Sequence, residues 1–568
     1  MSFADFVLAS SLCSTGQKWS SLWHSEKFKH LICLYRMVSS EYLRREILEI
    51  NAPGTLPNVK IGEVCLRFSI QPTPLFGIQH VRAAFLHYYY ALRYRGKLII
   101  RFEDTSPIEG SAEFVVNLLK DLKTLGITYD FVSYTSDYFL QMIKMAESLI
   151  LQGKAYVDNT PPEQIRKEMV HGIESKCRNH SPEENMALWK QMMDGSDVGR
   201  KCYLRGKLDM RHPNLRDPVY YLCSPNPHNR TGTKFKVYPT NNFSCPYIDA
   251  AQTITHVLRS SYHKKSSPLY YRILKDMGFS RIQIYNFKLL NMAYMPPRPH
   301  QLEWFVKNEK VDGWDDPRLP TVQGLARRGV MIGALKKFLY EQGTLKNSLI
   351  EWDRLWSINI EMLETEDSCV HTAVLVEKRV RLRLTNFLGD EDKNRHMFNY
   401  SKEKDVEVTK FSKEIWLEKA DACSFSEGDE INLMDWNTAI IEGIEKDKDG
   451  NVTALSGYLN GGNPYKSPKN PMLWLPVTDE LVDLSLVKFD YLITKKKLEA
   501  KEDFLDVLNP CTKKERRALG NPDMRNLKHG EIVLLGMKGY YRCDVPSVDA
   551  SKPIVLFAIP GGAYRCEF

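Results

Sequence analysis

The chain has 568 residues, of which 43% are hydrophobic and 26% are charged, and its formal net charge is +8 at pH 7. This is the composition of an ordinary soluble globular protein, and at roughly 100–200 residues per domain the length allows three to five domains. No apolar run reaches the roughly 18 residues of a membrane-spanning helix, so no membrane segment is expected. The modest positive charge permits an anionic partner such as RNA but does not require one.

The 12 cysteines are scattered from Cys13 to Cys566 and form no Cys-x-x-Cys pair. Neither a zinc ribbon nor a disulfide framework is therefore expected. The plain interpretation is free thiols in a reducing compartment. The first 45 residues mix Ser, His and Lys with few acids. They are interpreted as a poorly ordered tail, with a targeting peptide as the alternative.

The first predicted elements follow an α/β pattern. Pro and Gly cluster in NAPGTLPNVKIG (51–62), which indicates a linker before the strand EVCLRFSI (63–70). A turn, QPTPLFGIQH (71–80), leads into an amphipathic run from Val81 and then a second strand. Strand, turn, helix and strand begin a nucleotide-binding α/β domain, in which the turn and the helix start hold phosphates. This turn, however, has no Gly-rich stretch and carries two prolines.

Two further segments, 111–130 and 137–158, have helical apolar periodicity. The predicted helices end at Gly126 and Gly153, because glycine favours the helix stop.

The second half of the chain changes character. Residues 161–234 are rich in charge and include strand-like pieces such as KCYLRGKLDM (201–210), and 234–259 returns to strand, loop and helix. After about Val370, short alternating strands separated by turn clusters predict an all-β region built of barrels. The basic run TKKERR (512–517) is interpreted as a solvated face.

This order of segments resembles class I glutamyl-tRNA synthetases of the cytoplasmic eukaryotic and archaeal type, including the glutamyl half of the bifunctional glutamyl-prolyl enzymes. The resemblance covers roughly residues 60–545. It rests on collinear stretches such as GKLIIRFEDTSP (96–107), VDGWDDPRLPTVQGLARRG (311–329) and FSEGDEINLMDW (425–436). FSCPYID (243–249) resembles the glutamate branch and not the glutamine branch.

The resemblance implies an α/β Rossmann-type catalytic core with an acceptor-binding insertion and a helical stem, followed by all-β anticodon-binding barrels. It implies ATP and Mg²⁺ as cofactors without a metal bound by the protein, glutamate-type tRNA as partner, and a cytoplasmic location without membrane attachment. Other synthetases or scaffold proteins are possible further partners. The implied boundaries are 1–60 for the N-terminal extension and linker, 61–130 and 237–290 for the two Rossmann halves, 131–236 for the insertion, 291–365 for the stem with its lysine loop, and 366–568 for the barrels.

The first ATP-binding signature of this family falls on Arg67 to His80 and is degenerate. Gly77, Ile78, Gln79 and His80 stand where the family has His-Ile-Gly-His. One phosphate-binding imidazole is lost, and the Gln79 side chain is expected to project where the adenine lies, because the family glycine lets the base stack on the backbone. His80 remains as a candidate catalytic residue, although it could merely cap its helix.

The second signature is a mobile loop of the Ser-Lys-Arg-Lys type. Its positions hold Arg298, Pro299, His300 and Gln301, so both family lysines are gone. Three prolines also stiffen a loop that must close. Arg298 and His300 are the cationic remnants that could compensate in part.

The resemblance places the amino-acid pocket at four residues. Arg67 matches the arginine that grips the substrate side-chain carboxylate, a task suited to a guanidinium. Glu103 matches the acid that holds the α-amino group, although with its neighbour Asp104 it could instead be a helix cap. Arg259 lines the same pocket, and Asn241 replaces a family tyrosine. An acid that the family carries near residue 261 is absent.

Trp314, Asp316 and Arg318 in the stem are candidate tRNA-binding residues, and the alternative is that they only brace the stem.

Two functional hypotheses remain open. Removing one preorganised donor from a charge-developing site costs roughly 10²–10³ in rate, so several losses predict a fall of roughly 10⁴ or more. The main hypothesis is a catalytically impaired member of the family that is retained as a tRNA- or partner-binding protein. The alternative is an active, divergent glutamate–tRNA ligase, and a purely structural role without RNA binding is a third.

Overall fold

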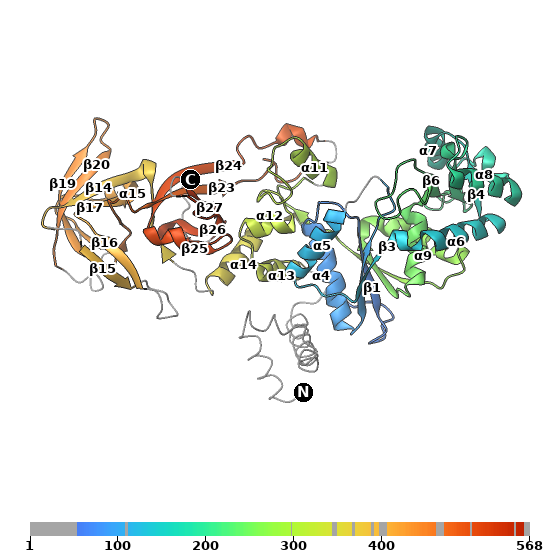
Figure 1. The fold of residues 1–568 in the computed structure, drawn as a ribbon, viewed down its shortest axis with the longest axis horizontal. Helices are drawn as coiled ribbons and strands as arrows, with labels where there is room; N and C mark the ends of the chain where they lie inside the picture. Colours follow the sequence, from blue (N-terminus) through green and yellow to red (C-terminus); the bar gives the residue numbers. More distant parts are fainter. Residues whose placement is uncertain are drawn as a thin grey trace, which may run out of the picture. The chain divides into compact units, whose positions relative to one another are not determined.

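The computed structural model describes residues 54–107, 112–296, 298–342, 349–365, 370–387, 391–396, 406–461, 471–499, 502–549 and 552–561. The chain divides into two compact units (Figure 1). The first unit runs to Leu290 and adds 339–348, and the second holds 291–338 and the chain from Leu349 onward. Most of the N-terminal extension predicted for 1–60 lies outside the described residues.

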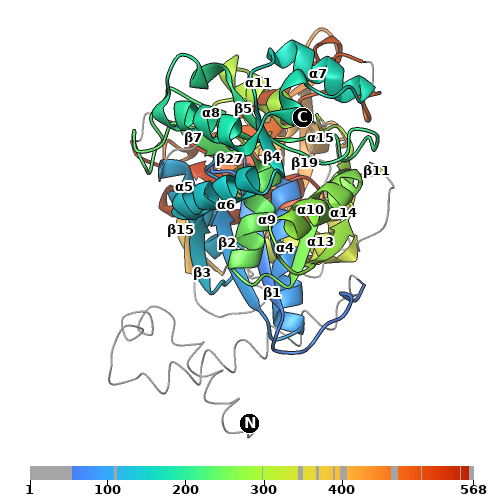
Figure 2. The same cartoon turned by 90° about the vertical axis from the view of Figure 1, so that its right-hand side faces the viewer.

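The first unit is built on a parallel sheet with the strand order β3-β2-β1-β8-β9. The order reverses between β1 and β8, and at such a switch point open α/β sheets bind ligands beyond the carboxyl ends of their strands. Figure 2 shows α4 beside β1 and β2. The elements are β1 (Cys65–Ile70), α4 (Ile78–Arg93), β2 (Lys97–Phe102), α5 (Ala112–Thr124), β3 (Phe131–Tyr134), α9 (Asn241–Ala251), β8 (His256–Ser260), α10 (Ser267–Asp276) and β9 (Gln283–Phe287).

Both faces of this sheet are covered, which explains why its strands are almost continuously apolar. On one face Phe68 of β1 contacts the His87 ring of α4, with ring centroids 5.5 Å apart. On the other face Ile99 of β2 packs with Tyr270 and Leu274 of α10. Successive side chains of a strand point to opposite faces, so Arg67 and Arg101 both point toward the α9–α10 face.

The two helices predicted before residue 158 are present, as α5 and α6 (Phe139–Leu151). Gly126 and Gly153 lie in the left-handed region, with φ of 66° and 65°. Only glycine adopts this conformation at little cost, so both predicted helix stops are confirmed.

An antiparallel sheet in the order β4-β5-β6-β7 follows, packed against helices α6 and α8. Its core contains the buried Trp189 and Tyr221 rings, whose centroids lie 5.2 Å apart. The fully buried ion pair Arg205–Asp158 and the partly buried pair Arg178–Asp217 hold its strands and loops together. The elements, teal to green in Figure 1, are β4 (Ala155–Asp158), α7 (Pro162–His171), α8 (Pro182–Asp194), β5 (Tyr203–Gly206), β6 (Val219–Cys223) and β7 (Val237–Pro239).

The second unit begins with a helical segment. Its short strand β10 (Asn291–Met292) pairs in parallel with β11 (Leu349–Ile350). The helices are α11 (Pro299–Lys307), α12 (Val322–Arg327), α13 (Ile332–Glu341), whose last residues belong to the first unit, and α14 (Asp353–Leu363).

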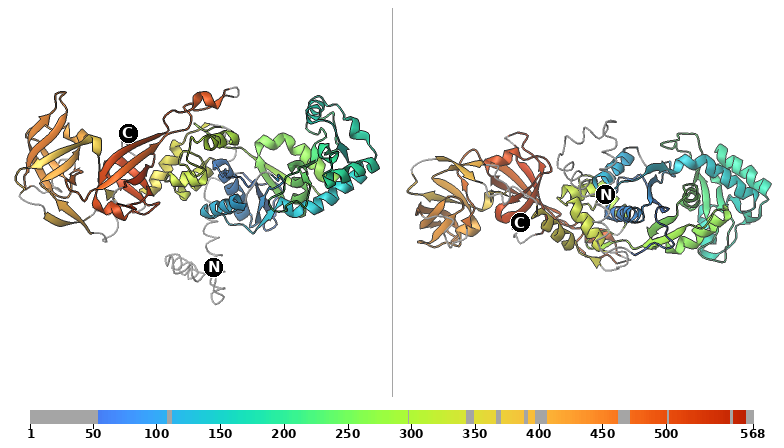
Figure 3. Two further views of the ribbon diagram at one scale, coloured as in Figure 1. Left: turned by 45° about the horizontal axis from the view of Figure 1, so that its top comes forward. Right: turned by 90° about the horizontal axis from the view of Figure 1, so that it is seen from below.

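Two seven-stranded, barrel-like sheets complete the second unit, each with its own apolar core (Figure 3). The strands β12 and β13 pair with β25 and β24, near the end of the chain, so one sheet is inserted in sequence within the other. The inserted sheet contains β14 (Arg379–Leu384), β17 (Glu414–Glu418), β18 (Glu430–Leu433), β19 (Asn437–Lys446), β20 (Val452–Leu459), β21 (Pro471–Met472) and β22 (Leu475–Pro476). The enclosing sheet contains β12 (Val370–His371), β13 (Ala373–Leu375), β23 (Val482–Phe489), β24 (Lys513–Gly520), β25 (Ile532–Leu535), β26 (Gly539–Val545) and β27 (Ile554–Ala558).

A separate hairpin pairs β15 (Glu391–His396) with β16 (Val406–Phe411). Among the described residues, no helix combines the length and the apolar character needed to cross a membrane.

Candidate active site

The turn after β1 ends at Gly77, which is the extended N-cap residue of α4. The Gly77 N–H donates to Nδ1 of His80 at 3.4 Å, and the Phe76 ring stacks on the imidazole with centroids 6.0 Å apart. Burial lowers the pKa of His80, so the ring is neutral at pH 7, and an accepting Nδ1 leaves its proton on Nε2. His80 therefore makes the cap contact and still carries one N–H donor.

Gln79, in the first turn of α4, does not extend freely into a cleft. Its Oε1 accepts a hydrogen bond from the Leu290 N–H at 2.9 Å, and its Nε2 donates to the Leu290 carbonyl. Leu290 is the last residue of the first unit before β10. Both polar groups of one carboxamide are thus paired with both backbone groups of one residue, across 211 positions of sequence.

Arg67 lies in a buried charge network on the α9–α10 face of the sheet. Its Nε donates to Asp249 at 3.0 Å, and Arg101 donates to the same carboxylate at 2.7 Å. Tyr270 donates to the other Asp249 oxygen at 2.9 Å, and Arg101 also donates to Gln252. Burial alone would raise the pKa of Asp249, but the two guanidinium groups outweigh it and lower that pKa.

Arg101 and Asp249 were not among the predicted site residues. The available signal was a charged residue inside the apolar strand KLIIRF, because a buried charge requires a partner.

Glu103, Cys245 and the Asn241 amide lie together beside Arg67. Asn241 Nδ2 donates to Glu103 at 3.3 Å, and the Cys245 thiol donates to the other carboxylate oxygen at 3.9 Å. Burial, helped by the Glu103 charge, raises the pKa of Cys245 to about 12. The thiol therefore acts as a neutral neighbour of the carboxylate.

Arg259 lies near Arg67 and Cys245. Its Nη2 donates to Ser267 at 2.8 Å and its guanidinium lies over the Tyr270 ring at 5.3 Å. Its buried Nε has no hydrogen-bond partner among the described residues. Burial and the charge of Arg67 lower the pKa of Arg259. The structure thus brings the four predicted pocket residues together.

Asp104, the neighbour of Glu103, has a structural role. Its carboxylate accepts hydrogen bonds from the Ser136 N–H at 2.9 Å and from the Ser136 hydroxyl at 2.6 Å. The capping alternative therefore describes Asp104, whereas Glu103 is paired with Asn241 and Cys245.

The second signature lies in the second unit and is partly helical. Pro299 is the first residue of α11, and Arg298 is its N-cap residue. The Arg298 N–H donates to the Gln301 side chain at 3.1 Å. Gln301 is buried, whereas Arg298 and His300 are exposed. Of the two positions where the family has lysines, one is therefore Pro299, which begins α11. The other is Gln301, whose side chain accepts a hydrogen bond at the start of that helix.

The predicted tRNA-binding stem residues make internal contacts. Asp316 is fully buried and accepts hydrogen bonds from the Asp312 N–H and from Arg318. Arg318 also donates to Thr512 at 2.8 Å, just before β24. Trp314 lies in the same loop. These contacts match the bracing alternative, and tRNA binding by these three residues stays a prediction.

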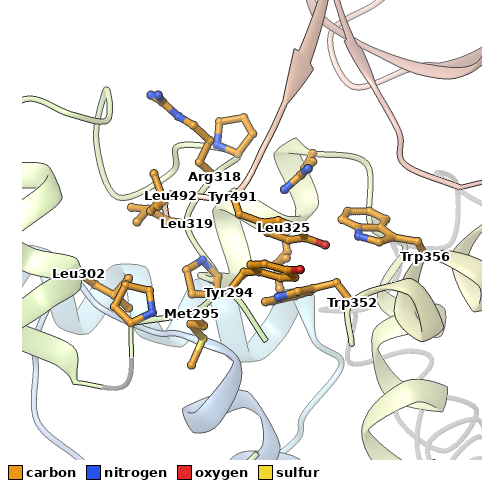
Figure 4. Close-up of a pocket in the computed structure, with 14 residues that line it drawn as sticks. Tyr294, Met295, Leu302, Arg318, Leu319, Leu325, Trp352, Trp356, Tyr491 and Leu492 are labelled. Carbon is orange, nitrogen blue, oxygen red and sulfur yellow. The ribbon is translucent and has the colours of Figure 1, made fainter. Parts of the chain in front are cut away.

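An aromatic pocket next to this loop is almost filled by its own side chains. The Tyr294 and Tyr491 rings stack with centroids 4.5 Å apart, and Trp352 donates to the Ala293 carbonyl (Figure 4). Trp356 lines the same pocket, whose free volume is only about 30 Å³. That space holds about one water molecule, whereas ligand sites have roughly 300–1,000 Å³. The described residues also contain no group of acidic, His and Cys side chains that could hold a metal ion.

A parallel sheet whose strand order reverses, an antiparallel sheet, a helical segment and two barrel-like sheets are the architecture of this chain, and its catalytic region is that of the class I tRNA synthetases. The chain belongs to the glutamate and glutamine family of this class: the catalytic-domain model of tRNA synthetases class I (E and Q) matches residues 63–365. Two anticodon-binding domain models of the same family match residues 371–460 and 472–544.

The chain is 47% identical to a cytoplasmic glutamate–tRNA ligase of Arabidopsis thaliana, over 99% of this chain and 83% of that protein. It is 39% identical to a probable cytoplasmic glutamate–tRNA ligase of Schizosaccharomyces pombe, over 89% and 71%. The bifunctional glutamate/proline–tRNA ligase of Mus musculus is 36% identical over 89% of this chain but only 34% of its own length. These comparisons show the family, and none of them shows a loss of activity, so the predicted impairment stays a prediction.

Proposed function

We propose that this chain is a glutamate–tRNA ligase, which joins glutamate to tRNA with the consumption of ATP. The observation that carries the proposal is the pocket of Arg67, Glu103 and Arg259. Glutamate has two carboxylates and one ammonium group, and the pocket presents two guanidinium groups and one carboxylate. The unpartnered Nε of Arg259 is a donor that a substrate carboxylate can satisfy.

Arg67 is already paired with Asp249, which orients it instead of neutralising it. Asp249 is shared with Arg101, so one carboxylate faces two guanidinium groups. The local charge stays positive, and a second carboxylate, from the substrate, would balance it. The Glu103 carboxylate on the other side of Cys245 suits the α-ammonium group.

The ATP step uses the start of α4. The helix N-terminus offers backbone N–H groups to phosphates, and the Nε2–H of neutral His80 is a further donor. Mg²⁺ usually keeps several waters and binds through substrate phosphates, so the absence of a protein metal cluster in the described part of the chain is compatible with it. Bound ATP would be attacked at its α-phosphorus by the glutamate α-carboxylate, which would form the acyl-adenylate as the bond to pyrophosphate breaks, and Mg²⁺ would offset the charge of the phosphates.

A second candidate function, a tRNA-binding protein with little or no catalysis, is favoured by the state of both signatures. Gly77 has no side chain to give a donor, Gln79 fills the base position, and Pro299 and Gln301 replace two cations. The cations that remain near the second signature are Arg298 and His300, both exposed. The two candidate functions both require tRNA binding and differ in the rate of aminoacylation.

The deciding experiment is aminoacylation of tRNA with labelled glutamate and glutamine, side by side, together with ATP–pyrophosphate exchange in the presence of tRNA. The ligase proposal predicts charging with glutamate and not with glutamine. Arg67→Lys keeps the charge but loses the two-pronged geometry, and it should raise the KM for glutamate about tenfold or more. Lys120→Gln, on the exposed face of α5, is the matched control. The absence of glutamate charging, with tRNA binding intact, would establish the second candidate.

We further propose a cytoplasmic location, since the relatives in Arabidopsis and fission yeast are named cytoplasmic ligases. Glutamate tRNA is the proposed RNA partner, because two anticodon-binding domain models match the C-terminal region. Contacts with other synthetases or scaffold proteins are proposed as well, since some relatives carry a second ligase in the same chain.

A further inference from the structure

Gln79 makes a contact that the degenerate signature alone does not explain. Its carboxamide is paired on both sides with the Leu290 backbone, accepting from the N–H and donating to the carbonyl. The Gln79 side chain is half-buried and Leu290 is buried. A long polar side chain at a helix start could instead have pointed into solvent, so this pairing fixes one conformation.

The chemistry of the pair is that of an adenine edge. A carboxamide offers one acceptor and one donor side by side. Adenine offers the same pair, a ring nitrogen that accepts and an exocyclic amine that donates. The Leu290 peptide groups therefore form a donor–acceptor edge that either partner satisfies, and only one can occupy it at a time.

The position of the pair is equally specific. Residue 79 is where the family glycine lets the adenine lie on the backbone, and the carboxamide extends from that residue to Leu290. The same carboxamide therefore occupies the space beside the helix start and pairs with the Leu290 N–H and carbonyl, which would otherwise be free to hydrogen-bond the base.

We propose that Gln79 is a built-in occupant of the adenine site, which mimics the base and must swing away from Leu290 before ATP binds. This proposal deepens the proposed function, on which it rests. It predicts weak ATP affinity with retained adenine specificity, because the Leu290 edge itself is intact. It also makes Gln79 a determinant of nucleotide affinity and not only a degenerate position of the signature.

The test measures nucleoside binding by isothermal titration calorimetry on the full-length protein, without glutamate or tRNA. Gln79→Gly and Gln79→Ala should both bind adenosine and ATP about tenfold to a hundredfold more tightly than the wild type, since two competing hydrogen bonds are removed. Inosine presents an acceptor and a donor in the reversed order, so its affinity should not rise.

Gln164→Gly is the matched control. Gln164 is also in the first turn of a helix, α7, and its side chain donates to Glu168 at 2.9 Å. It should leave adenosine binding unchanged. Thermal unfolding of each variant checks the fold, and Gln79→Ala is the safer variant because alanine favours helices.

The proposal is wrong if neither Gln79 variant binds adenosine more tightly than the wild type. It is equally wrong if inosine affinity rises as much as adenosine affinity, or if Gln164→Gly gains as much. Because no aminoacylation is measured, failure of the ligase proposal would show only in the charging assay, and failure of this one only in the titration.

Discussion

Arg67 and Asp249, which are 182 positions apart in the sequence, form a buried ion pair with a 3.0 Å contact in the centre of the first unit. Arg101 reaches the same carboxylate at 2.7 Å. One acid thus holds two arginines of neighbouring strands on the face that carries the candidate substrate pocket. Stability of the unit and geometry of the pocket therefore depend on the same carboxylate.

Asp249→Asn should destabilise the first unit strongly. The change leaves two buried guanidinium groups without their counter-charge, and breaking a buried pair in this way costs about 3–5 kcal/mol. Calorimetry should show that the thermal unfolding transition of the first unit moves to a lower temperature. Asp137→Asn, which breaks a half-exposed pair with Arg230, is the control and should shift it little. Equal shifts for the two variants would contradict this account.

The same carboxylate predicts acid sensitivity. The pKa of Asp249 is lowered from its ordinary 3.8 in the folded protein, so the unfolded chain takes up the proton first as the pH falls. The contribution of the pair to the free energy of unfolding is therefore complete above about pH 5 and is lost as the pH falls through the folded-state pKa. Urea unfolding between pH 7 and pH 2.5 should show this loss, with a shallower decline in Asp249→Asn. An identical decline in both proteins would place the acid sensitivity elsewhere.

We predict two separable tasks for His80, a helix-cap contact and a donor to the ATP phosphates. His80 is the third residue of α4, and a glutamine at that position can also accept the cap hydrogen bond. His80→Ala should therefore lower the free energy of unfolding by about 1 kcal/mol, whereas His80→Gln should leave it unchanged. Both variants remove the Nε2–H donor and should lower ATP–pyrophosphate exchange by about 10²–10³. Full exchange activity in His80→Gln would reduce His80 to a helix cap.

Restoring the lysines of the second signature should recover little by itself. The double change Pro299→Lys with Gln301→Lys adds two cations, but it removes the proline that starts α11 and the side chain that accepts from the Arg298 N–H. Groups that act as a unit are not additive, so adding Gly77→His and Gln79→Gly should give the larger gain in exchange rate. Full activity from the lysine pair alone would show that the first signature limits nothing.

The local features were predictable from the sequence. Apolar periodicity located the strands and helices of the first unit, and glycine chemistry located the stops at Gly126 and Gly153, because both signals depend on neighbouring residues. The resemblance supplied the pocket residues one by one. Their convergence was visible only in the structure.

The long-range pairings were not predictable. Gln79 pairs with a backbone 211 positions away, and Arg101 with a carboxylate 148 positions away. Similarly, β12 and β13 pair with strands beyond the inserted sheet. A side chain's hydrogen-bonding capacity is local information, but its partner is set by the packing of distant elements. Residue type could therefore indicate that Arg101 needs a partner without naming Asp249.

Binding of tRNA should survive the loss of both ATP signatures, because phosphate contacts give affinity and single-stranded bases give specificity. Both anticodon-binding domain matches lie in the second unit, where β24 exposes Lys513 and Lys514. Binding to glutamate tRNA should weaken as salt rises, by about 0.7–0.9 log units per phosphate contact per log unit of salt.

Filter binding over a salt series, with glutamate tRNA and several unrelated tRNAs, measures this slope. The double change of Lys513 and Lys514 to glutamine should weaken binding of every tRNA. It should also reduce the salt slope by about 0.7–0.9 for each phosphate contact that is lost, and at most two contacts are lost. The matched control replaces two exposed lysines of α5, Lys120 and Lys123, with glutamine and should leave the slope unchanged. Equal, salt-insensitive binding to all the tRNAs, or no binding to any of them, would exclude the tRNA-binding candidate, whereas the ligase proposal is decided by the charging assay.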